Sequence, residues 1–311
     1  MTVLSRLDVL LSLEPAECRA LLRAMDEAQR RELRTHWYLW AHPGQRPPSA
    51  AWHTWLIMAG RGYGKTRAGA EWVRHVAEHD PTARIALVAA SLGEARQVMV
   101  EGTAGLLGVA RDENRPRFKP STRELVWRNG ATATLYSAGE PESLRGPQHS
   151  HAWCDEIAKW DQAGRRAEAS WDNLLLGLRL GVAPQVVATT TPRAVPLVRR
   201  LLGQGDAIVT RGTTVENKDN LPSGFLRSVR VQFGRSLLGR QELEGELIDE
   251  IEGALWQREL LEDCREDAAS APARRVVIGV DPPASSDGDA CGIVVCALGE
   301  DGVARVLADK S

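Results

Sequence analysis

The chain has 311 residues, of which 43% are hydrophobic and 26% charged, which is enough for one large core or for two domains. Its formal net charge of −2 excludes a globally cationic nucleic-acid binder, so any such binding must come from local sites. No run of about 18 apolar residues occurs, so we expect no transmembrane helix and no membrane partner. The five cysteines include no C-x-x-C pair, which indicates a reducing compartment and argues against a structural zinc site.

The first 50 residues read as an N-terminal helical or lid segment. Leucines at helical spacing predict helix over residues 3–35, with Pro15 beginning a second helix. The apolar stretch at the start is short and has no cleavage site, so we expect a cytoplasmic amphipathic helix and no signal peptide. A Pro/Gly-rich loop, residues 42–48, then leads into the next segment.

Residues 52–74 have the order strand, glycine-rich turn and helix that is typical of a phosphate-binding loop. Residues 55–58 are a short apolar run, and Lys65 opens a segment of good helix formers. The first glycine of the G-x-x-x-x-G-K-[ST] pattern is replaced by Ala59, a small residue that such a loop tolerates. A chance glycine turn is the alternative, and the strand and helix on either side argue against it.

Each residue type in this loop suits the binding of a triphosphate. Glycines let backbone N–H groups surround phosphate oxygens, and the following helix directs its positive dipole end at the same anion. Lys65 would supply a charge for the β- and γ-phosphates, and the Thr66 hydroxyl would ligate Mg²⁺. The predicted nucleotide-binding residues of the loop are Gly60, Arg61, Gly62, Tyr63, Gly64, Lys65, Thr66 and Arg67.

The rest of residues 51–264 alternates strands with helices, which indicates a mainly parallel sheet covered on both faces. We expect strands at 84–90, 151–154, 185–189 and 207–210, a hairpin over 124–136 with the turn pair Asn129-Gly130, and helices at 92–106, 168–180 and 221–250.

An acidic pair follows the apolar strand 151–154. Asp155 would hold the Mg²⁺ shell, and Glu156 would be the general base that polarises the attacking water. Adjacent side chains at a strand end point in different directions, so one can face the metal and the other the γ-phosphate. The alternative for this pair is an acidic helix start.

Further candidates lie on loops. The hydroxyls of Thr189, Thr190 and Thr191 end a strand and could sense the γ-phosphate, although such a string is often only a strand end. Arg61 in cis, Arg145 from a neighbouring subunit, and Arg193 are alternatives for stabilising transition-state charge. Gln45 could bind an adenine edge, with Trp37 or Tyr38 stacking nearby, or be a solvated loop residue beside core aromatics.

A linker is expected at residues 265–275, followed by strands at 276–281, 291–297 and 304–308. Three strands without a helix do not make a stable domain, so we expect residues 276–311 to begin a second domain whose remainder is absent. Asp281 ends the first of these strands, whereas Asp287 and Asp289 suit a turn.

Taken in order, AGRGYGKTRAGAEW, SLRG, WCDE, TTTPR, GRQELEGE and VVIGVDPP resemble the large terminase subunit of tailed phages and gene transfer agents, over nearly the whole chain. The resemblance implies an N-terminal packaging ATPase of the RecA-like P-loop fold, joined to an RNase H-like nuclease domain. It implies ATP and Mg²⁺ as cofactors. For the ATPase site it implies that Lys65 and Thr66 bind phosphate and Mg²⁺, that Asp155 is the metal carboxylate and that Glu156 is the catalytic carboxylate. It further implies that Thr189–Thr191 form the coupling motif, Arg145 is a trans arginine finger, Gln45 binds adenine and Asp281 is the first metal ligand of the nuclease.

The resemblance also implies partners. These are double-stranded DNA held by its phosphates, a portal protein, the small terminase subunit and further copies of the chain, in a ring when assembled and as monomers in isolation. The place of action is the host cytoplasm, at the procapsid portal. Because a single carboxylate cannot hold two Mg²⁺ ions, this chain is not expected to cut DNA. The alternatives are a nucleotide-regulated docking module at a portal and a helicase-like repair ATPase.

Overall fold

The computed structural model describes residues 12–163, 166–233, 236–248, 264, 272–282 and 291–310. The chain divides into two compact units, residues 1–249 and residues 250–311, and each is described by itself. Within the described residues no helix is both long and apolar enough to cross a membrane.

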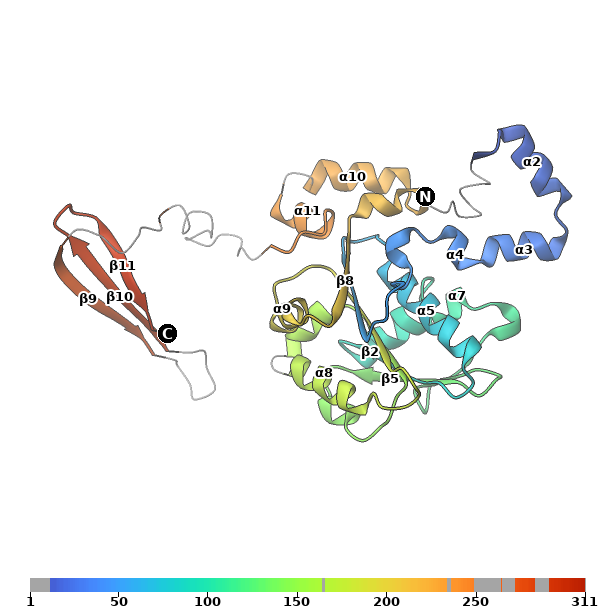
Figure 1. Ribbon diagram of the computed structural model, residues 1–311, viewed down its shortest axis with the longest axis horizontal. Coiled ribbons are helices and arrows are strands. Elements are labelled where there is room, and N and C mark those ends of the chain that lie inside the picture. The colour runs from blue at the N-terminus through green and yellow to red at the C-terminus, as the bar shows by residue number, and fades with distance from the viewer. Residues whose placement is uncertain are drawn as a thin grey trace. The chain divides into compact units, whose positions relative to one another are not determined.

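The first unit is built on an eight-stranded sheet with the order β3-β4-β5-β2-β6-β7-β1-β8 (Figure 1). Strands β5, β2, β6, β7, β1 and β8 run parallel to one another, whereas β4 pairs antiparallel with both β5 and β3. Their bounds are β1 Thr54–Ala59, β2 Arg84–Ala89, β3 Arg117–Lys119, β4 Glu124–Val126, β5 Thr132–Ser137, β6 His151–Cys154, β7 Gln185–Thr190 and β8 Ala207–Gly212. The predicted α/β class with a mainly parallel sheet is therefore confirmed.

Helices cover both faces of this sheet (Figure 1). One face packs against α5, η2 and α7, and the other packs against η5, α8 and α9. The bounds are α5 Lys65–His79, α6 Leu92–Glu94, η2 Ala95–Val100, α7 Leu106–Val109, η3 Asp112–Asn114, η4 Pro141–Leu144, η5 Ile157–Ala163, α8 Arg166–Gly177, α9 Pro196–Gly203, η6 Thr214–Asn220, α10 Ser223–Phe233 and α11 Leu237–Glu242.

Strand β1, which pairs with β7 and β8, shows why the sheet forms here. All six of its residues are buried, and successive side chains point to opposite faces. Trp55 and Ile57 join the core under α5, whereas Leu56 and Met58 join the core under α8 and α9. A short, wholly apolar run is thus the signature of a strand covered on both sides.

The N-terminal segment consists of short helices, α2 Pro15–Ala24, α3 Glu27–Thr35 and α4 Trp37–Trp40, followed by the single turn η1 Pro43–Gln45. Asp26 separates the first two because its side chain accepts a hydrogen bond from the backbone N–H of Gln29, which begins α3. Arg30 then donates to the last carbonyls of α2. The part of the expected helix before residue 12 lies outside the described residues.

Two expected helices are shorter than predicted. The helix expected over 92–106 is α6 continued by a π-helical turn, η2, and then broken before α7, because Gly102 and Gly105 disfavour helix. The helix expected over 221–250 is divided into α10 and α11, and Ser236 caps the start of α11 with a bond from the N–H of Gly239. The hairpin over 124–136 forms as β4 and β5, and β3 adds an unexpected edge strand to it.

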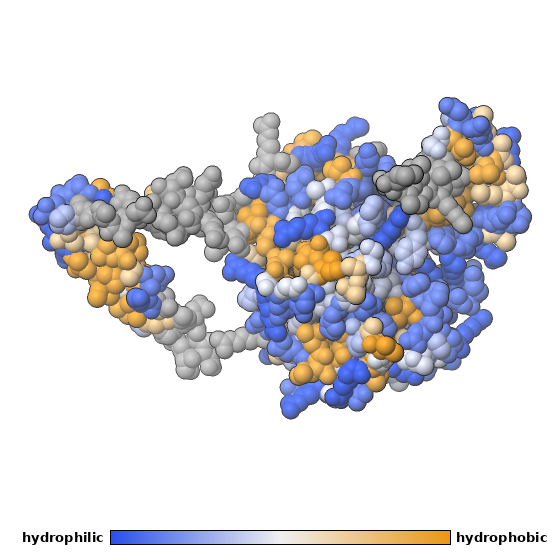
Figure 2. All heavy atoms as spheres, in the orientation of Figure 1, coloured by the Kyte–Doolittle hydropathy of each residue, from blue (hydrophilic) through white to orange (hydrophobic). Residues whose placement is uncertain are grey.

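The second unit contains a three-stranded antiparallel sheet of order β11-β10-β9, made of β9 Ala273–Asp281, β10 Gly292–Gly299 and β11 Ala304–Asp309. Its first strand begins three residues before the expected 276, and most of the expected linker 265–275 lies outside the described residues. Val276, Ile278, Val280 and Val306 are each more than half exposed, and the sheet's apolar surface is orange in Figure 2. Asp281 is exposed at the end of β9.

Stability should depend on pH through His149, which is buried between β5 and the end of α8. Burial lowers its pKa from 6.5 to about 4, and its Nε2 has no hydrogen-bond partner among the residues that the structure describes. As the pH falls from 6.5 toward 4, the unfolded state takes up a proton that the folded state refuses, so stability is lost. We expect His149→Phe to remove about 2 kcal/mol of this loss between pH 7 and pH 5. Urea unfolding of the parent and of His149→Phe at pH 7 and at pH 5 measures the free energy of unfolding of each. An equal loss of stability in the two proteins between these pH values would contradict the prediction.

Candidate nucleotide site at the carboxyl end of the sheet

The loop between β1 and α5 has the backbone that a phosphate requires. Gly62 and Gly64 have φ angles of +81° and +95°, which are accessible to glycine and costly for other residues. Gly64 is the N-cap of α5 and offers no side-chain cap. The first N–H groups of this 15-residue helix therefore remain available to an anion at its N-terminus.

Tyr63 turns away from the inside of this loop and anchors it in the protein. Its ring is fully buried and meets the edge of His42 at 4.5 Å between ring centroids. A Cβ on Gly44 or Gly212 would collide with this ring, so both glycines are needed for its close approach. Tyr63 thus contributes its backbone to the loop, whereas its side chain fastens the loop to η1 and β8.

Residues far along the chain support the loop from outside. The Thr214 hydroxyl donates to the carbonyl of Arg61 at 2.6 Å, and the Asn217 amide donates to the carbonyl of Gly62 at 2.7 Å. The N–H of Arg61 donates to the carbonyl of Glu242 at 2.6 Å. The loop conformation is therefore set jointly by η6 and by the end of α11, which sequence reasoning did not identify.

Lys65, the first residue of α5, is almost completely buried and directs its ammonium group at the loop. Its Nζ donates to the carbonyls of Ala59 at 2.8 Å and Gly60 at 3.0 Å, and it lies 3.8 Å from Oε1 of Glu156. Burial lowers the pKa of this ammonium, while Glu156 and Asp155 oppose that shift. A cation so poorly solvated is well placed to gain from an anionic ligand.

Thr66 and Asp155 come together although 89 positions separate them. Oγ1 of Thr66 lies 3.5 Å from Oδ1 of Asp155, which also accepts a 2.7 Å hydrogen bond from the Thr189 hydroxyl. Burial, and next the charge of Glu156, raises the pKa of Asp155 to about 6. A buried carboxylate beside a hydroxyl fits the oxygen donors that Mg²⁺ prefers, and a dication would favour its charged form.

Glu156 is held in an unusual backbone conformation. Its φ angle is +48°, one of two positive values among the described non-glycine residues. The strain is balanced by contacts: its N–H donates to Thr189 Oγ1 at 3.2 Å, and its Oε2 accepts from the N–H and hydroxyl of Thr191 at 3.2 and 2.9 Å. Burial favours the neutral acid, but Lys65 and the two Thr191 bonds outweigh it and lower the pKa of Glu156. Such strain is characteristic of functional positions.

A small cavity of about 90 Å³ opens in front of Glu156. This volume is enough for several waters. Besides Glu156 it is lined by three cations and by Ala158 and Thr191; the cations are Arg61, Lys159 and Arg193. One carboxylate facing three cations suits a site in which water attacks a phosphoryl group.

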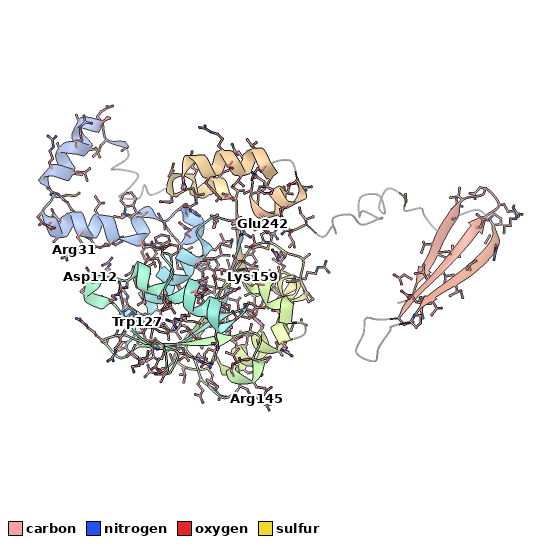
Figure 3. The ribbon with its side chains drawn as sticks, turned by 180° about the vertical axis from the view of Figure 1, so that it is seen from behind. Arg31, Asp112, Trp127, Arg145, Lys159 and Glu242 are labelled. Carbon is pink, nitrogen blue, oxygen red and sulfur yellow. The ribbon has the colours of Figure 1, made fainter. Side chains whose placement is uncertain are left out.

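The carboxylate of Glu242 lies between two of these cations. It accepts from Nε of Arg61 at 3.0 Å and lies 3.7 Å from Nη2 of Arg193. Glu242 and Lys159 lie in the same part of the unit in Figure 3. Arg145 lies elsewhere, at the lower edge of that view, with a side chain 75% exposed and an ion pair to Glu142 at 3.5 Å. The structure brings Arg61 and Arg193 to the acidic pair of the same chain and does not bring Arg145 there.

Gln45 and its neighbours occupy the back of the loop. Its Nε2 donates to the carbonyls of Tyr63 and Gly64, both at 3.3 Å, and its Oε1 accepts from the N–H of His42. Both donors of this buried amide are thus directed at the loop. Arg67, the third residue of α5, pairs with Glu71 and places its guanidinium 5.2 Å from the centre of the Trp37 ring.

Sequence reasoning thus placed Lys65, Thr66, Asp155 and Glu156 in one site, and the structure assembles them. It missed Lys159, Thr214, Asn217 and Glu242. Two of these residues could have been found from sequence features. Lys159 lies three residues after the acidic pair, and Glu242 belongs to the motif GRQELEGE. Asp281 lies in the second unit, and the described residues contain no cluster of three or more His, Cys, Asp or Glu that could hold a metal ion.

Comparison with known proteins identifies the fold. The family model described as terminase large subunit, T4likevirus-type, N-terminal, matches residues 56–263. The ATPase domain of the Thermus phage P74-26 large terminase is similar, with a TM-score of 0.51 and 14% identity over 67% of this chain and 94% of that chain. The large terminase of a thermophilic bacteriophage is similar with a TM-score of 0.53 and 11% identity, over 90% of this chain and 67% of that chain. A structure of that terminase in complex with ADP is also similar, with a TM-score of 0.53 and 12% identity over 88% of this chain and 66% of that chain. No curated protein matches the chain.

Proposed function

The chain belongs to the terminase large subunit family, and on this premise we propose that it is an ATP-hydrolysing motor subunit that moves double-stranded DNA into a capsid. One observation carries the proposal. Two segments that are far apart in the sequence meet beside a cavity lined with cations. One supplies Lys65 and Thr66, and the other, 89 positions after Thr66, supplies Asp155 and Glu156. Similar structures include complexes of a phage large terminase with ATP-γ-S and with ADP, which supports nucleotide as the ligand.

Each residue has a role in the proposed hydrolysis. Lys65 and the N-terminus of α5 would bind the β- and γ-phosphates, and Thr66 and Asp155 would hold Mg²⁺. When bound, Mg²⁺ neutralises charge on the phosphates. Glu156 accepts the proton of the attacking water, because Lys65 and Thr191 keep it ionised. Arg61 is positioned for charge stabilisation in cis.

The threonines at the end of β7 are proposed to couple hydrolysis to movement. Thr189 and Thr191 bond directly to Asp155 and Glu156, so a change at the acidic pair is transmitted to the end of β7. Thr190 bonds to the N–H of Ala158 in η5. Loss of the γ-phosphate would therefore alter a network that already spans two strands and a helix.

Assembly is proposed to complete the site. Arg145 is exposed and remote from the acidic pair of its own chain, which suits a residue that reaches a neighbouring subunit. A ring of subunits at a portal, together with the small terminase subunit and duplex DNA, would supply that neighbour. We propose action in the host cytoplasm at the procapsid portal. We further propose that Asp281 is a metal ligand of an RNase H-like nuclease domain that begins near residue 276.

The decisive test compares the parent with Lys65→Ala. We expect the variant to bind ATP about 10- to 100-fold more weakly, because a charge-assisted bond is lost, and to show no measurable turnover. ATP binding and phosphate release are measured with and without duplex DNA and at high protein concentration. A parent that binds ATP and never hydrolyses it would contradict the motor and favour a nucleotide-regulated docking module.

Gln45 provides a second prediction. Because its amide supports the loop, we expect Gln45→Ala to weaken ATP and GTP binding by the same factor, roughly 5- to 10-fold. Competition with a fluorescent nucleotide measures both affinities. A selective loss of ATP binding would instead favour the adenine contact that the sequence suggested.

A further inference from the structure

A second concave surface lies at the β3 edge of the sheet, apart from the nucleotide site. We name it the edge groove; it has a volume of about 630 Å³ and is lined by Asp112, Arg115, Pro116, Arg117, Lys119, Val126, Trp127 and Arg128. Asp112 and Trp127 lie to one side of the unit in Figure 3, well separated from Lys159 and Glu242. The proposed function assigns no role to these residues.

The charge of the edge groove is positive and largely unpaired. Its lining includes four basic residues and one acidic residue. Lys119 pairs with Glu124 at 3.6 Å, whereas Arg115, Arg117 and Arg128 are not in any ion pair found among the described residues. Like charges gathered without counter-charges repel one another, so the surface is suited to an anion with several charges.

The shape of the edge groove fits an extended anion. Arg117 and Lys119 occupy alternate positions of β3, which places them about 6.6 Å apart along it. Arg115, in extended backbone at the end of η3, lies two residues before Arg117. On the same face, Val126 lies opposite Arg117 in the antiparallel register and forms part of the apolar floor. One DNA strand carries a charge every 3.4 Å or so along its axis, so a row of cations can contact more than one phosphate of the same strand.

The position of the edge groove leaves room for a long ligand. β3 is the outermost strand of the eight-stranded sheet, and no further strand of this sheet pairs with its outer side. Only β5 and β2 lie between β4 and the strand β6 that leads to the acidic pair. A ligand held here is therefore connected to the nucleotide site through consecutive paired strands.

We propose that the edge groove binds the phosphate backbone of duplex DNA without reading its sequence. This inference rests on the proposed function, since it names the surface by which the motor holds its substrate. Arg115, Arg117 and Arg128 provide the contacts, and the apolar floor of Pro116, Val126 and Trp127 fixes their spacing.

The experiment measures the binding of two unrelated labelled duplexes to the full chain by fluorescence anisotropy, between roughly 50 and 200 mM salt. We expect Arg117→Ala/Arg128→Ala to weaken binding of both duplexes about 10- to 100-fold at ~0.1 M salt. The slope of log K against log salt should fall in magnitude by about 1.8, since each phosphate contact contributes ~0.9. Arg117→Lys/Arg128→Lys should retain most of the slope, because charge is conserved.

The matched control is Arg227→Ala on α10, which follows β8 at the opposite edge of the sheet, and it should change the slope little. DNA-free ATP turnover and melting temperature should be unaltered in all variants, which separates this proposal from the proposed function. If turnover is absent in the parent, the motor assignment fails by itself. If the double alanine variant has unchanged DNA affinity and an unchanged salt slope, the proposal that the edge groove binds DNA is overturned. This holds even if that variant loses binding to an acidic protein. An equal effect of Arg227→Ala would also overturn it, because general charge would then explain the binding.

Discussion

Glu156→Gln is expected to reduce ATP turnover by about 10²- to 10⁴-fold, the usual contribution of a general base. The glutamine keeps the size of the side chain and retains an oxygen that can accept from Thr191, whose N–H and hydroxyl bond Oε2 at 3.2 and 2.9 Å. It lacks the negative charge that would take the proton from water. ATP affinity should stay within a few-fold of the parent, because Lys65 and Thr66 are untouched.

Phosphate release and equilibrium ATP binding measure these two quantities separately. Glu113→Gln is the matched control, since Glu113 is an exposed glutamate on η3, away from the cavity. It should hydrolyse ATP like the parent. A Glu156→Gln protein that retains more than a tenth of the parent's turnover would exclude Glu156 as the general base. Weakened ATP binding of the same size would show that its role is structural.

Arg145→Ala is expected to lower turnover by about 10³- to 10⁵-fold under conditions of assembly, with ATP affinity unchanged. The reason is that Arg145 lies on an exposed turn, paired only loosely with Glu142, and reaches no group of its own site. We therefore propose that its charge acts on a neighbouring chain. Turnover as a function of protein concentration measures this, because the parent should accelerate as subunits meet and the variant should not.

Mixing two inactive variants decides whether the arginine acts in trans. Arg145→Ala retains an intact Glu156, and Glu156→Gln retains an intact Arg145. At a mixed interface, the Arg145 of one chain can complete the site of the other, so equal mixing should restore a substantial fraction of parent turnover. Arg61→Ala mixed with Glu156→Gln should not recover, since Arg61 and Glu156 line one cavity within a chain. Recovery in the second mixture and failure in the first would exchange the roles of the two arginines.

The sequence by itself determined the local features of this protein. The run from Trp55 to Met58 is wholly apolar and forms a strand buried on both faces. The glycines before Lys65 allow the positive φ angles that the loop adopts, and good helix formers continue it as α5. These outcomes depend on residues within a few positions of one another, so backbone preference and hydrophobic patterning are sufficient to predict them.

Where local preference was weak, prediction was wrong. The segment from Leu92 to Leu106 contains helix-compatible residues, but its glycines permit a break, and packing of η2 against the sheet decides the outcome. The strand β3 has only three residues, too few for a recognisable alternation, and it forms because β4 is present to pair with it. The basic row of the edge groove follows from that pairing.

The tertiary structure alone decided how the parts of the site meet. The left-handed backbone of Glu156, its bonds to Thr191, and the reach of Glu242 to Arg61 across 181 positions could not be read from any local pattern. Gln45 is likewise directed at the loop by its surroundings and not by its neighbours in sequence. The physical reason is that these contacts depend on strand order and on the burial of charges, both of which are set only when the whole sheet packs.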